Sequence, residues 1–362
     1  MAQLRTGRFP AVAVAAGAAL VFSASPAEAS TGNLRGSGTA DFSGKGECGI
    51  ATNMLDFNEA GMNTFCEMGF DFWWNWDHVP TTIYSNDCAW KKFVPMIWGV
   101  DPGNSRIAKT AAARLMGYNE PDLWGPPAVP GADYLASGSF APTFHCGSED
   151  LANNWQEYVM AYKATHPTGQ VFSPSMADAD PEHGASAGPF ADCNQSPQTP
   201  GEHMPFCPGW LKCFKENVKQ KSCGETDCWE VIDVLQFHAY AYTAEEVIQK
   251  IASWETVWAE DLSGASGKKK SLWLTEVARA GAVDSADPDG KTRAFMQEIV
   301  EYMRGSPSVS GWSWFSQDST SFASFEINGI QPETATWASE LIDKDGQATE
   351  IGKFYAELCK QR

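Results

Sequence analysis

Short apolar runs recur along the chain, and most of them precede a polar loop and a stretch with helical periodicity. The run at 93–98 is apolar at successive positions, which is typical of a strand buried on both faces of a parallel sheet. Apolar residues with helical spacing occur at 150–165, 244–258 and 292–303. The pattern predicts eight strands, at residues 49–54, 71–74, 92–98, 115–119, 171–175, 231–238, 272–276 and 311–315.

This alternation of strands and helices predicts an α/β fold with a parallel sheet. Eight repeats favour a closed (β/α)8 barrel, the TIM barrel, over an open doubly wound sheet, because no Gly-x-Gly-x-x-Gly turn follows the first strand. We expect a single domain over residues 47–362. The segment 178–230 is rich in proline, glycine and cysteine, so we expect a disulfide-pinned insertion there, between the fifth and sixth strands.

The first 29 residues are typical of a signal peptide, with two early arginines, an apolar run at 9–22 and small residues near the end. An uncleaved anchor is the alternative, but the apolar run is short for a membrane span. Residues 30–46 are small and polar and predict a flexible arm. We therefore expect a secreted protein, extracellular or in the cell wall, without membrane contact once the leader is removed.

Cysteine usage agrees with export. All ten cysteines follow the leader, and an even number in an exported chain indicates disulfides. Four of them lie within 207–228, where their spacing does not match the Cys-x2-Cys pairs of a zinc module, so we favour structural bridges over a metal site. The positions are Cys48, Cys66, Cys88, Cys146, Cys193, Cys207, Cys213, Cys223, Cys228 and Cys359.

The chain is strongly acidic, and its composition limits the partners we expect. Removing residues 1–29 takes away two arginines and one glutamate and changes the net charge from −19 to −20. Such a surface repels phosphates, which disfavours nucleic acid and anionic membranes and suits a neutral carbohydrate polymer. An acidic surface that serves only solubility is an equal alternative.

Two predicted strands end on a glutamate, and (β/α)8 barrels carry their chemistry at the C-terminal ends of strands. Glu120 follows the strand at 115–119, and Glu276 closes the strand at 272–276. A retaining glycosidase needs one carboxylic acid to protonate the leaving oxygen and a carboxylate about 5–5.5 Å away to attack the anomeric carbon. We expect burial and the partner's charge to raise the pKa of the donor, and hydrogen bonds to keep the nucleophile ionised. The structural alternative is a loop cap at Glu120 and an ion pair at Glu276.

Four stretches resemble the signature blocks of glycoside hydrolase family 128, which includes the alkali-sensitive linkage proteins of fungal cell walls. They are Phe-Val-Pro-Met-Ile-Trp-Gly at 93–99, Gly-Tyr-Asn-Glu-Pro-Asp at 117–122, Trp-Leu-Thr-Glu at 273–276 and Trp-Ser-Trp-Phe at 312–315. The resemblance implies a (β/α)8 barrel of the large retaining clan A that cleaves β-1,3-glucan. It also implies that Glu120 is the acid/base and Glu276 the nucleophile. The cysteines and the segment 178–230 depart from the family's core and bear on cleft length and on endo versus exo action.

Other polar residues at strand ends are candidate substrate-binding residues. Asn119 either donates to the sugar 2-hydroxyl or forms an Asx turn. His238 and Tyr240 close the sixth strand, where they hydrogen-bond sugar or orient Glu276, unless His238 is a satisfied buried histidine. Asn75, after the second strand, faces the cleft or makes a turn.

The chain has 15 tryptophans, and several follow or end predicted strands. Flat aromatic faces suit the C–H faces of β-linked glucose, although most tryptophans in any barrel are core residues. We expect two or three of the following six to contact sugar, mainly Trp98, Trp124 and Trp314. The six are Trp74, Trp76, Trp98, Trp124, Trp312 and Trp314.

The sequence therefore predicts a monomeric, secreted retaining glycosidase that binds and cleaves β-1,3-glucan, with endo action expected. No organic cofactor is implied, because side chains supply the acid, the base and the nucleophile. The six histidines are scattered, so no metal site is expected. Two alternatives remain: a non-catalytic cell-wall protein that binds β-glucan in the same cleft, and a hydrolase of the same clan that acts on another linkage, such as β-1,4 or β-1,6.

Overall fold

The computed structural model describes residues 46–52, 59–79, 87–97, 113–121, 146–147, 149–176, 210–280, 286–316 and 339–361. All of them belong to one compact unit, residues 42–362. The expected leader at 1–29, most of the expected arm at 30–46 and the first part of the expected insertion lie outside the described residues.

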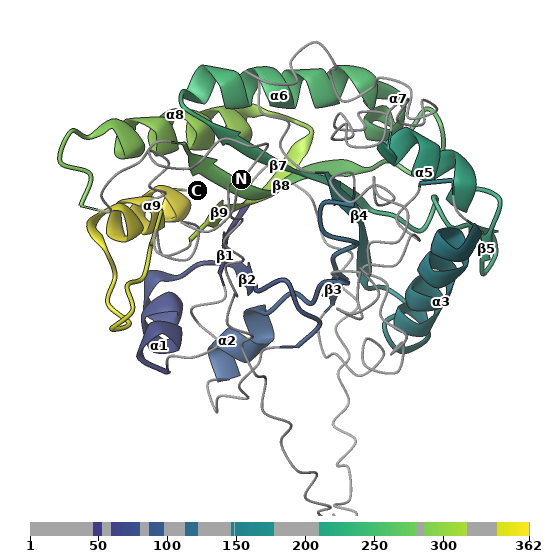
Figure 1. Ribbon diagram of the computed structural model, residues 1–362, viewed down its shortest axis with the longest axis horizontal. Coiled ribbons are helices and arrows are strands. Elements are labelled where there is room, and N and C mark those ends of the chain that lie inside the picture. Colours follow the sequence, from purple (N-terminus) through teal and green to yellow (C-terminus); the bar gives the residue numbers. More distant parts are fainter. Residues whose placement is uncertain are drawn as a thin grey trace, which may run out of the picture. The chain divides into compact units, whose positions relative to one another are not determined.

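A curled parallel sheet of seven strands forms the centre of a mixed α/β fold (Figure 1). The strands follow the order β2-β1-β9-β8-β7-β4-β3, and every neighbouring pair is parallel. Parallel neighbours place all their carboxyl ends at one edge of the sheet, where loops can bring their side chains together. The strands are β1 (Glu47–Ala51), β2 (Phe72–Trp74), β3 (Arg114–Leu115), β4 (Gln170–Met176), β7 (Val234–Ala241), β8 (Ser271–Arg279) and β9 (Val309–Phe315).

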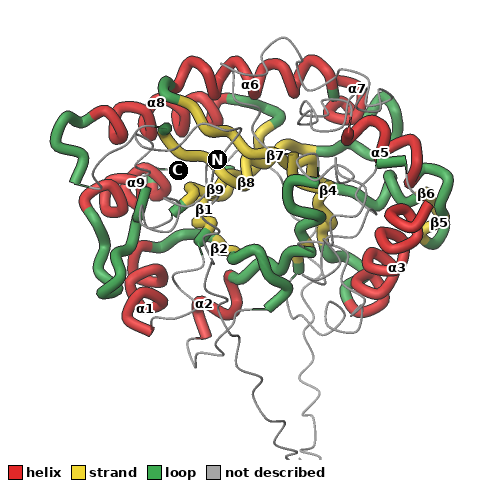
Figure 2. Tube along the Cα trace, in the orientation of Figure 1, coloured by secondary structure: helices red, strands yellow, loops and turns green. Residues whose placement is uncertain are grey.

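Helices cover the outer side of the curled sheet (Figure 2). Helix α6 begins with a capping box, in which Thr243 and Glu246 each accept a hydrogen bond from the other's backbone N–H. None of the described helices combines the length and the apolar character that crossing a membrane requires. The helices are α1 (Glu59–Met68), α2 (Asp87–Lys92), α3 (Glu149–Thr165), α5 (Trp210–Val218), α6 (Ala244–Val257), α7 (Ala259–Ser263), α8 (Lys291–Gly305) and α9 (Glu350–Lys360).

Alternation along the strands divides the buried side chains into two packed layers. On β7, Phe237 faces outward and stacks on Trp254 of α6, with ring centroids 4.3 Å apart, whereas Val234 belongs to an inner cluster drawn from strands and the segments beside them. Close packing inside the curl leaves no room for a side chain at Gly311, where a Cβ would lie 2.3 Å from the ring of Trp273. The inner cluster consists of Ala51, Phe72, Trp74, Val94, Met96, Met116, Phe172, Val234 and Trp273.

The segment predicted as a strand at 92–98 forms no continuous strand in its described part. Helix α2 extends to residue 92, and single parallel bridges join Phe93 to Trp73 and Met96 to Met116. Pro95 has no N–H to donate to a ladder, although its carbonyl accepts from the N–H of Met116 at 2.9 Å. Proline therefore explains why a strongly apolar run pairs only at isolated positions.

The bounds of another predicted strand need correction, and part of the predicted insertion is described. The strand expected at 231–238 begins only at Val234 and continues to Ala241. The described part of segment 178–230 contains α5 and a short antiparallel hairpin of β5 (Ser222–Cys223) and β6 (Thr226–Asp227). Apolar residues at 210, 211, 214 and 218 are buried and have helical spacing, a signal that the irregular composition of the segment obscured.

Disulfides account for eight of the ten cysteines, as expected for an exported chain. The other two, at 193 and 207, lie outside the described residues. One bridge ties the first strand, β1, to the last helix, α9. The four bridges are Cys48–Cys359, Cys66–Cys88, Cys146–Cys213 and Cys223–Cys228.

Removing the bridge between β1 and α9 should destabilise the fold more than removing the smallest bridge. Cys48 and Cys359 are separated by 311 residues, and Cys223 and Cys228 by 5. The chain-entropy model gives an upper limit of about 6 kcal/mol for the loss at the long loop and about 2 kcal/mol at the short one. Urea unfolding of the two double Cys→Ala variants measures the free energy of unfolding that each bridge contributes. Both pairs are buried, and both double variants lose the same atoms, so the two variants differ mainly in loop length. Equal losses of unfolding free energy would therefore contradict the chain-entropy account.

Candidate active site

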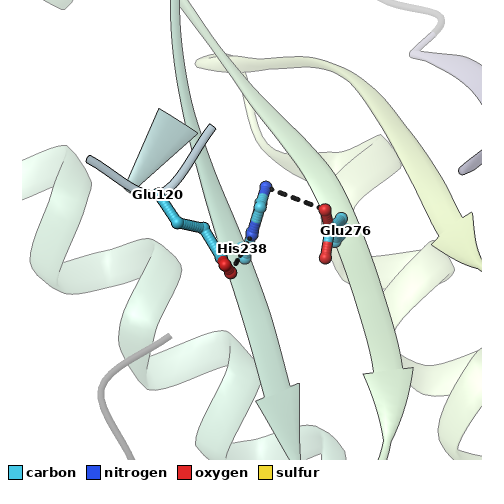
Figure 3. Close-up of side chains that lie close together, drawn as sticks. All are labelled: Glu120, His238 and Glu276. Carbon is cyan, nitrogen blue, oxygen red and sulfur yellow. Dashed lines mark hydrogen bonds and ion pairs between the residues drawn. The ribbon is translucent and has the colours of Figure 1, made fainter. Parts of the chain in front are cut away.

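Three ionisable side chains from different parts of the chain meet at the carboxyl edge of the sheet (Figure 3). Glu120 follows β3, His238 lies on β7 and Glu276 lies on β8. One nitrogen or carboxylate oxygen from each residue lies within 4.8 Å of those of the other two. The two glutamates singled out from the sequence are therefore neighbours in space.

Glu120 is held by its backbone as well as by its side chain. Its N–H donates to the carbonyl of Ser175 on β4 at 2.8 Å, and its φ of +44° lies in the left-handed region, which is unfavourable for a residue with a Cβ. The side-chain Oε1 lies 2.8 Å from Nδ1 of His238, and 21% of the side chain is exposed. The carboxyl group thus has one oxygen fixed by histidine and remains accessible to a ligand.

An irregularity in β8 determines where Glu276 points. Phe237 pairs with Leu274 but His238 pairs with Glu276, so Thr275 is an extra residue in the β8 ladder. Without this bulge, alternation would turn Glu276 outward with Leu274, toward the helices. The extra residue returns the carboxylate to the inner face, where His238 lies.

Glu276 is deeply buried and hydrogen-bonded on both oxygens. The indole N–H of Trp76 donates to Oε1 at 2.7 Å, and the hydroxyl of Tyr240 donates to Oε2. Nε2 of His238 lies 3.4 Å from Oε1. These groups fix the orientation of a carboxylate that has almost no contact with solvent.

Burial raises the pKa of Glu276 to about 7, and the nearby charge of Glu120 acts in the same direction. Three groups lower this pKa without outweighing the loss of water: the donors Tyr240 and Trp76, and the positive charge that His238 carries when it is protonated. We expected hydrogen bonds to keep this carboxyl ionised, but they do not keep its pKa low. The physical reason is its depth, since the residue is only 3% exposed.

Two hydroxyl groups lie behind His238, and the sequence analysis missed both. Oγ of Ser175 lies 2.5 Å from Nε2 of His238 and 3.1 Å from Oγ1 of Thr275. All three side chains are buried. The sequence did offer one signal for these hydroxyl groups, a small polar residue at an inner position of an otherwise apolar strand. That signal is weak, because it does not say which residue of a neighbouring strand the hydroxyl meets.

Aromatic rings line the other side of Glu276. The ring of Trp76 lies 4.9 Å from that of Trp74 and 5.7 Å from that of Phe315, and Phe315 lies 5.4 Å from Tyr240. Trp76 also has a left-handed backbone, with φ of +63°. The sequence analysis named Trp76 only among possible sugar contacts, whereas the structure makes it a hydrogen-bond donor to Glu276.

The three tryptophans that we favoured as sugar contacts have different outcomes. Trp98 and Trp124 lie outside the described residues. Trp314 is fully buried, packs against Phe295 of α8 and Tyr355 of α9, and donates its indole N–H to a backbone carbonyl. Alternation along β9 turns Trp314 toward the helices, so the expectation that it contacts sugar is corrected: it is a core residue.

The two candidate asparagines differ in their surroundings. Asn75 makes a turn, with Oδ1 accepting from the N–H of Asp77 at 3.1 Å and Nδ2 near the carbonyl of Val79 at 3.4 Å. Asn119 is buried beside Glu120 and pairs with Ser175 of β4. Its Oδ1 has no hydrogen-bond partner among the described residues.

Among the described residues, Glu120, His238 and Glu276 form the one group with side chains suited to a metal ion. Their arrangement favours hydrogen bonding, because the imidazole faces Glu120 with Nδ1 and Glu276 with Nε2 and lies between them (Figure 3). A metal would need the ligand atoms to converge on one point, about 3.3 Å apart for tetrahedral zinc. The 2.8 Å contact between His238 and Glu120 is shorter than that.

Solved structures with a similar fold include β-1,3-glucanases of glycoside hydrolase family 128. The chain is similar to an endo-β-1,3-glucanase of glycoside hydrolase family 128, subgroup II, from Sorangium cellulosum (21% identity, 87% of this chain and 100% of that chain covered, TM-score 0.51). A subgroup VI exo-β-1,3-glucanase from Aureobasidium namibiae is 16% identical over 86% of this chain and 96% of that chain, with a TM-score of 0.54. A third similar structure is a subgroup I endo-β-1,3-glucanase mutant from Amycolatopsis mediterranei in complex with laminaripentaose. It is 16% identical over 86% of this chain and 98% of that chain, with a TM-score of 0.52.

No curated protein matches the sequence. The family model described as the glycosyl hydrolase catalytic core matches residues 49–355, which include every strand from β2 to β9 and all three side chains of the site. This match agrees with the resemblance to glycoside hydrolase family 128 found in the sequence. The chain therefore belongs to the glycosyl hydrolase catalytic core family.

Proposed function

We propose that the chain is a retaining β-1,3-glucanase in which Glu120 is the acid/base and Glu276 the nucleophile. The observation that carries the proposal is the approach of the two carboxylates, which have oxygens within 4.8 Å of each other. Retaining glycosidases place these groups about 5–5.5 Å apart, whereas inverting ones leave roughly 6.5–9.5 Å for a water molecule. The similar solved structures support β-1,3-glucan as the substrate.

In the first step, Glu120 gives its proton to the glycosidic oxygen while a carboxylate oxygen of Glu276 attacks the anomeric carbon. The bond from that carbon to the leaving sugar breaks, and a covalent ester to Glu276 forms. Tyr240 and Trp76 hold the attacking group in one orientation through their hydrogen bonds.

In the second step, the Glu120 carboxylate takes a proton from a water molecule whose oxygen attacks the same carbon. The ester to Glu276 breaks, and the product keeps the configuration of the substrate. The partial exposure of Glu120 suits this role, because water has to reach both the carboxylate and the anomeric carbon beside it.

We infer that the sheet is completed to a closed (β/α)8 barrel by residues 93–96. The parallel bridges from Phe93 to Trp73 and from Met96 to Met116 support this, because they link β2 and β3, the two ends of the seven-stranded order. We propose residues 47–362 as the catalytic domain, following a cleaved leader at 1–29 and an arm at 30–46. Four disulfides fit export.

A non-catalytic β-glucan-binding protein is the alternative function. Binding alone has no need of a carboxylate buried at the expense of stability next to a second one, so the geometry favours the enzyme. Hydrolysis of β-1,4 or β-1,6 linkages would use the same residues. Parallel assays on linked glucans, with chain length of the products recorded, separate these specificities and the endo and exo modes.

Purified residues 30–362 should release reducing sugars from laminarin, and the first product seen by NMR should be the β-anomer, before mutarotation. Glu120→Gln and Glu276→Gln should each lower kcat/KM by about 10³-fold or more, because each removes a reacting group. Glu298→Gln, an exposed glutamate on α8, is the matched control. Absence of turnover by the wild type, or an α-anomer as first product, would sink the proposal.

The pH profile should report the ionisation of Glu276. The nucleophile acts as a carboxylate, so kcat/KM should rise with pH through about 7, the pKa of Glu276. Tyr240→Phe removes a donor that stabilises the ionised form, so the pKa rises and the rising limb moves upward by about 0.5–1 in pH. Tyr242→Phe, an exposed tyrosine two residues away, should leave the profile unchanged. A downward movement in Tyr240→Phe would contradict the assignment.

Glu276→Gln should also stabilise the fold at alkaline pH while abolishing activity. The folded pKa of about 7 exceeds the unfolded value near 4.5, so the buried carboxylate destabilises the fold fully above pH 7 and not below about 4.5. The variant should gain up to about 3 kcal/mol in urea unfolding at pH 8 and little at pH 4. Glu298→Gln controls for the loss of one surface charge. A gain that does not change with pH would show that burial of charge is not its cause.

A further inference from the structure

A chain of two buried hydroxyl groups ends on His238, and its direction can be derived from burial. The side chain of Thr275 is fully buried, and within the described residues its hydroxyl contacts only Oγ of Ser175, at 3.1 Å. A buried O–H without an acceptor costs about 1–3 kcal/mol. Thr275 therefore donates its hydrogen to Ser175.

The hydroxyl hydrogen of Ser175 must then be donated to another acceptor. Its Oγ already accepts from Thr275, and its other partner is Nε2 of His238, at 2.5 Å. The serine hydrogen therefore points at Nε2, which must present a lone pair. A neutral imidazole carries one N–H, so the hydrogen of His238 is on Nδ1, 2.8 Å from Oε1 of Glu120.

We propose that Thr275 and Ser175 are positioning residues that fix the tautomer of His238 and thereby keep the acidic proton of Glu120 on Oε2, the oxygen that does not face the histidine. This proposal rests on the proposed function, in which Glu120 protonates the leaving oxygen. Because Nδ1–H donates to Oε1, that oxygen is an acceptor, and a proton on the carboxyl group can reside only on Oε2.

The opposite tautomer would disable the acid. With hydrogen on Nε2, the imidazole would donate toward Oε1 of Glu276, 3.4 Å away, and Nδ1 would accept a hydrogen bond from Oε1 of Glu120 (Figure 3). The acidic proton would then be held between Glu120 and His238, away from a sugar. The hydroxyl chain prevents this, and the N–H on Nδ1 also stabilises the Glu120 carboxylate that remains after proton transfer.

The same bulge that aims Glu276 supplies the first member of this chain. Thr275 is the extra residue of β8, and it reaches Ser175 across the sheet although β7 lies between their strands. Ser175 also anchors the backbone of Glu120 through its carbonyl. Nucleophile, histidine and acid are therefore coupled through two small side chains that touch no reacting atom.

The tautomer can be observed directly by ¹⁵N NMR on protein labelled at histidine, with the His238 signal assigned by its loss in His238→Gln. The wild type should show hydrogen on Nδ1. Ser175→Ala should transfer it to Nε2, and Thr275→Val, of similar shape but without the hydroxyl, should give a mixture. Thr275→Ser, which retains the hydroxyl, should keep the wild-type tautomer. Ser173→Ala, a buried serine on β4 that bonds Gln236 instead, is the matched control.

Kinetic measurements on two substrates distinguish a proton-positioning role of Ser175 from a purely structural role. Ser175→Ala should lower kcat/KM for laminarin by about 10- to 100-fold, within the range of general acid catalysis. It should change kcat/KM for a dinitrophenyl β-laminaribioside by less than about 3-fold, because that leaving group needs no proton. Ser173→Ala should affect both substrates equally.

Three results would overturn the proposal: hydrogen on Nε2 in the wild type, an unchanged tautomer in Ser175→Ala, or equal losses on both substrates in that variant. If Ser175→Ala does not fold, Thr275→Val and Thr275→Ser give the same comparison. Failure of the proposed function has a different signature, namely a wild type that cleaves neither substrate while the NMR result follows the hydroxyl chain.

Discussion

The extra residue in β8 is the constraint on which the rest of the site depends. It turns Glu276 from the helix-facing side of the sheet to the inner side, where Trp76 and Tyr240 hydrogen-bond both of its oxygens. It also brings Thr275 to Ser175. One inserted residue therefore fixes the direction of Glu276, the proposed nucleophile, and begins the hydrogen-bond chain toward Glu120, the proposed acid. Bulges commonly occur next to functional sites.

Burial underlies the proposed reactivity of Glu276 and also makes the site unfavourable for folding. The carboxylate is buried beside Trp76 and Tyr240, and loss of water raises its pKa to about 7. Two fixed donors offset part of that effect. A poorly solvated carboxylate held in one orientation is a better nucleophile than a hydrated one, so the energetic penalty and the proposed chemistry have the same origin.

The penalty is tolerated because the scaffold around it is rigid. Apolar layers pack on both faces of the curled sheet, and a disulfide joins β1 to α9. Glu120 and Trp76 adopt left-handed backbones next to this scaffold. Hydrogen bonds to strand atoms hold both: the N–H of Glu120 on Ser175 and the indole of Trp76 on Glu276.

The sequence by itself determined the α/β class of fold and the use of cysteines in disulfides, and it singled out two glutamates that are neighbours in space. Apolar periodicity and the position of a polar residue at a strand end are local properties, which a sequence shows directly. Tertiary structure alone decided which side chains face inward. The bulge at Thr275 reversed the direction in which the following side chains of β8 point. Pro95 interrupted the hydrogen-bond ladder at 93–96, and alternation along β9 placed Trp314 against the helices. Contacts of this kind join residues far apart in the chain, and no local pattern specifies which neighbour a small hydroxyl such as that of Ser175 will meet across a sheet.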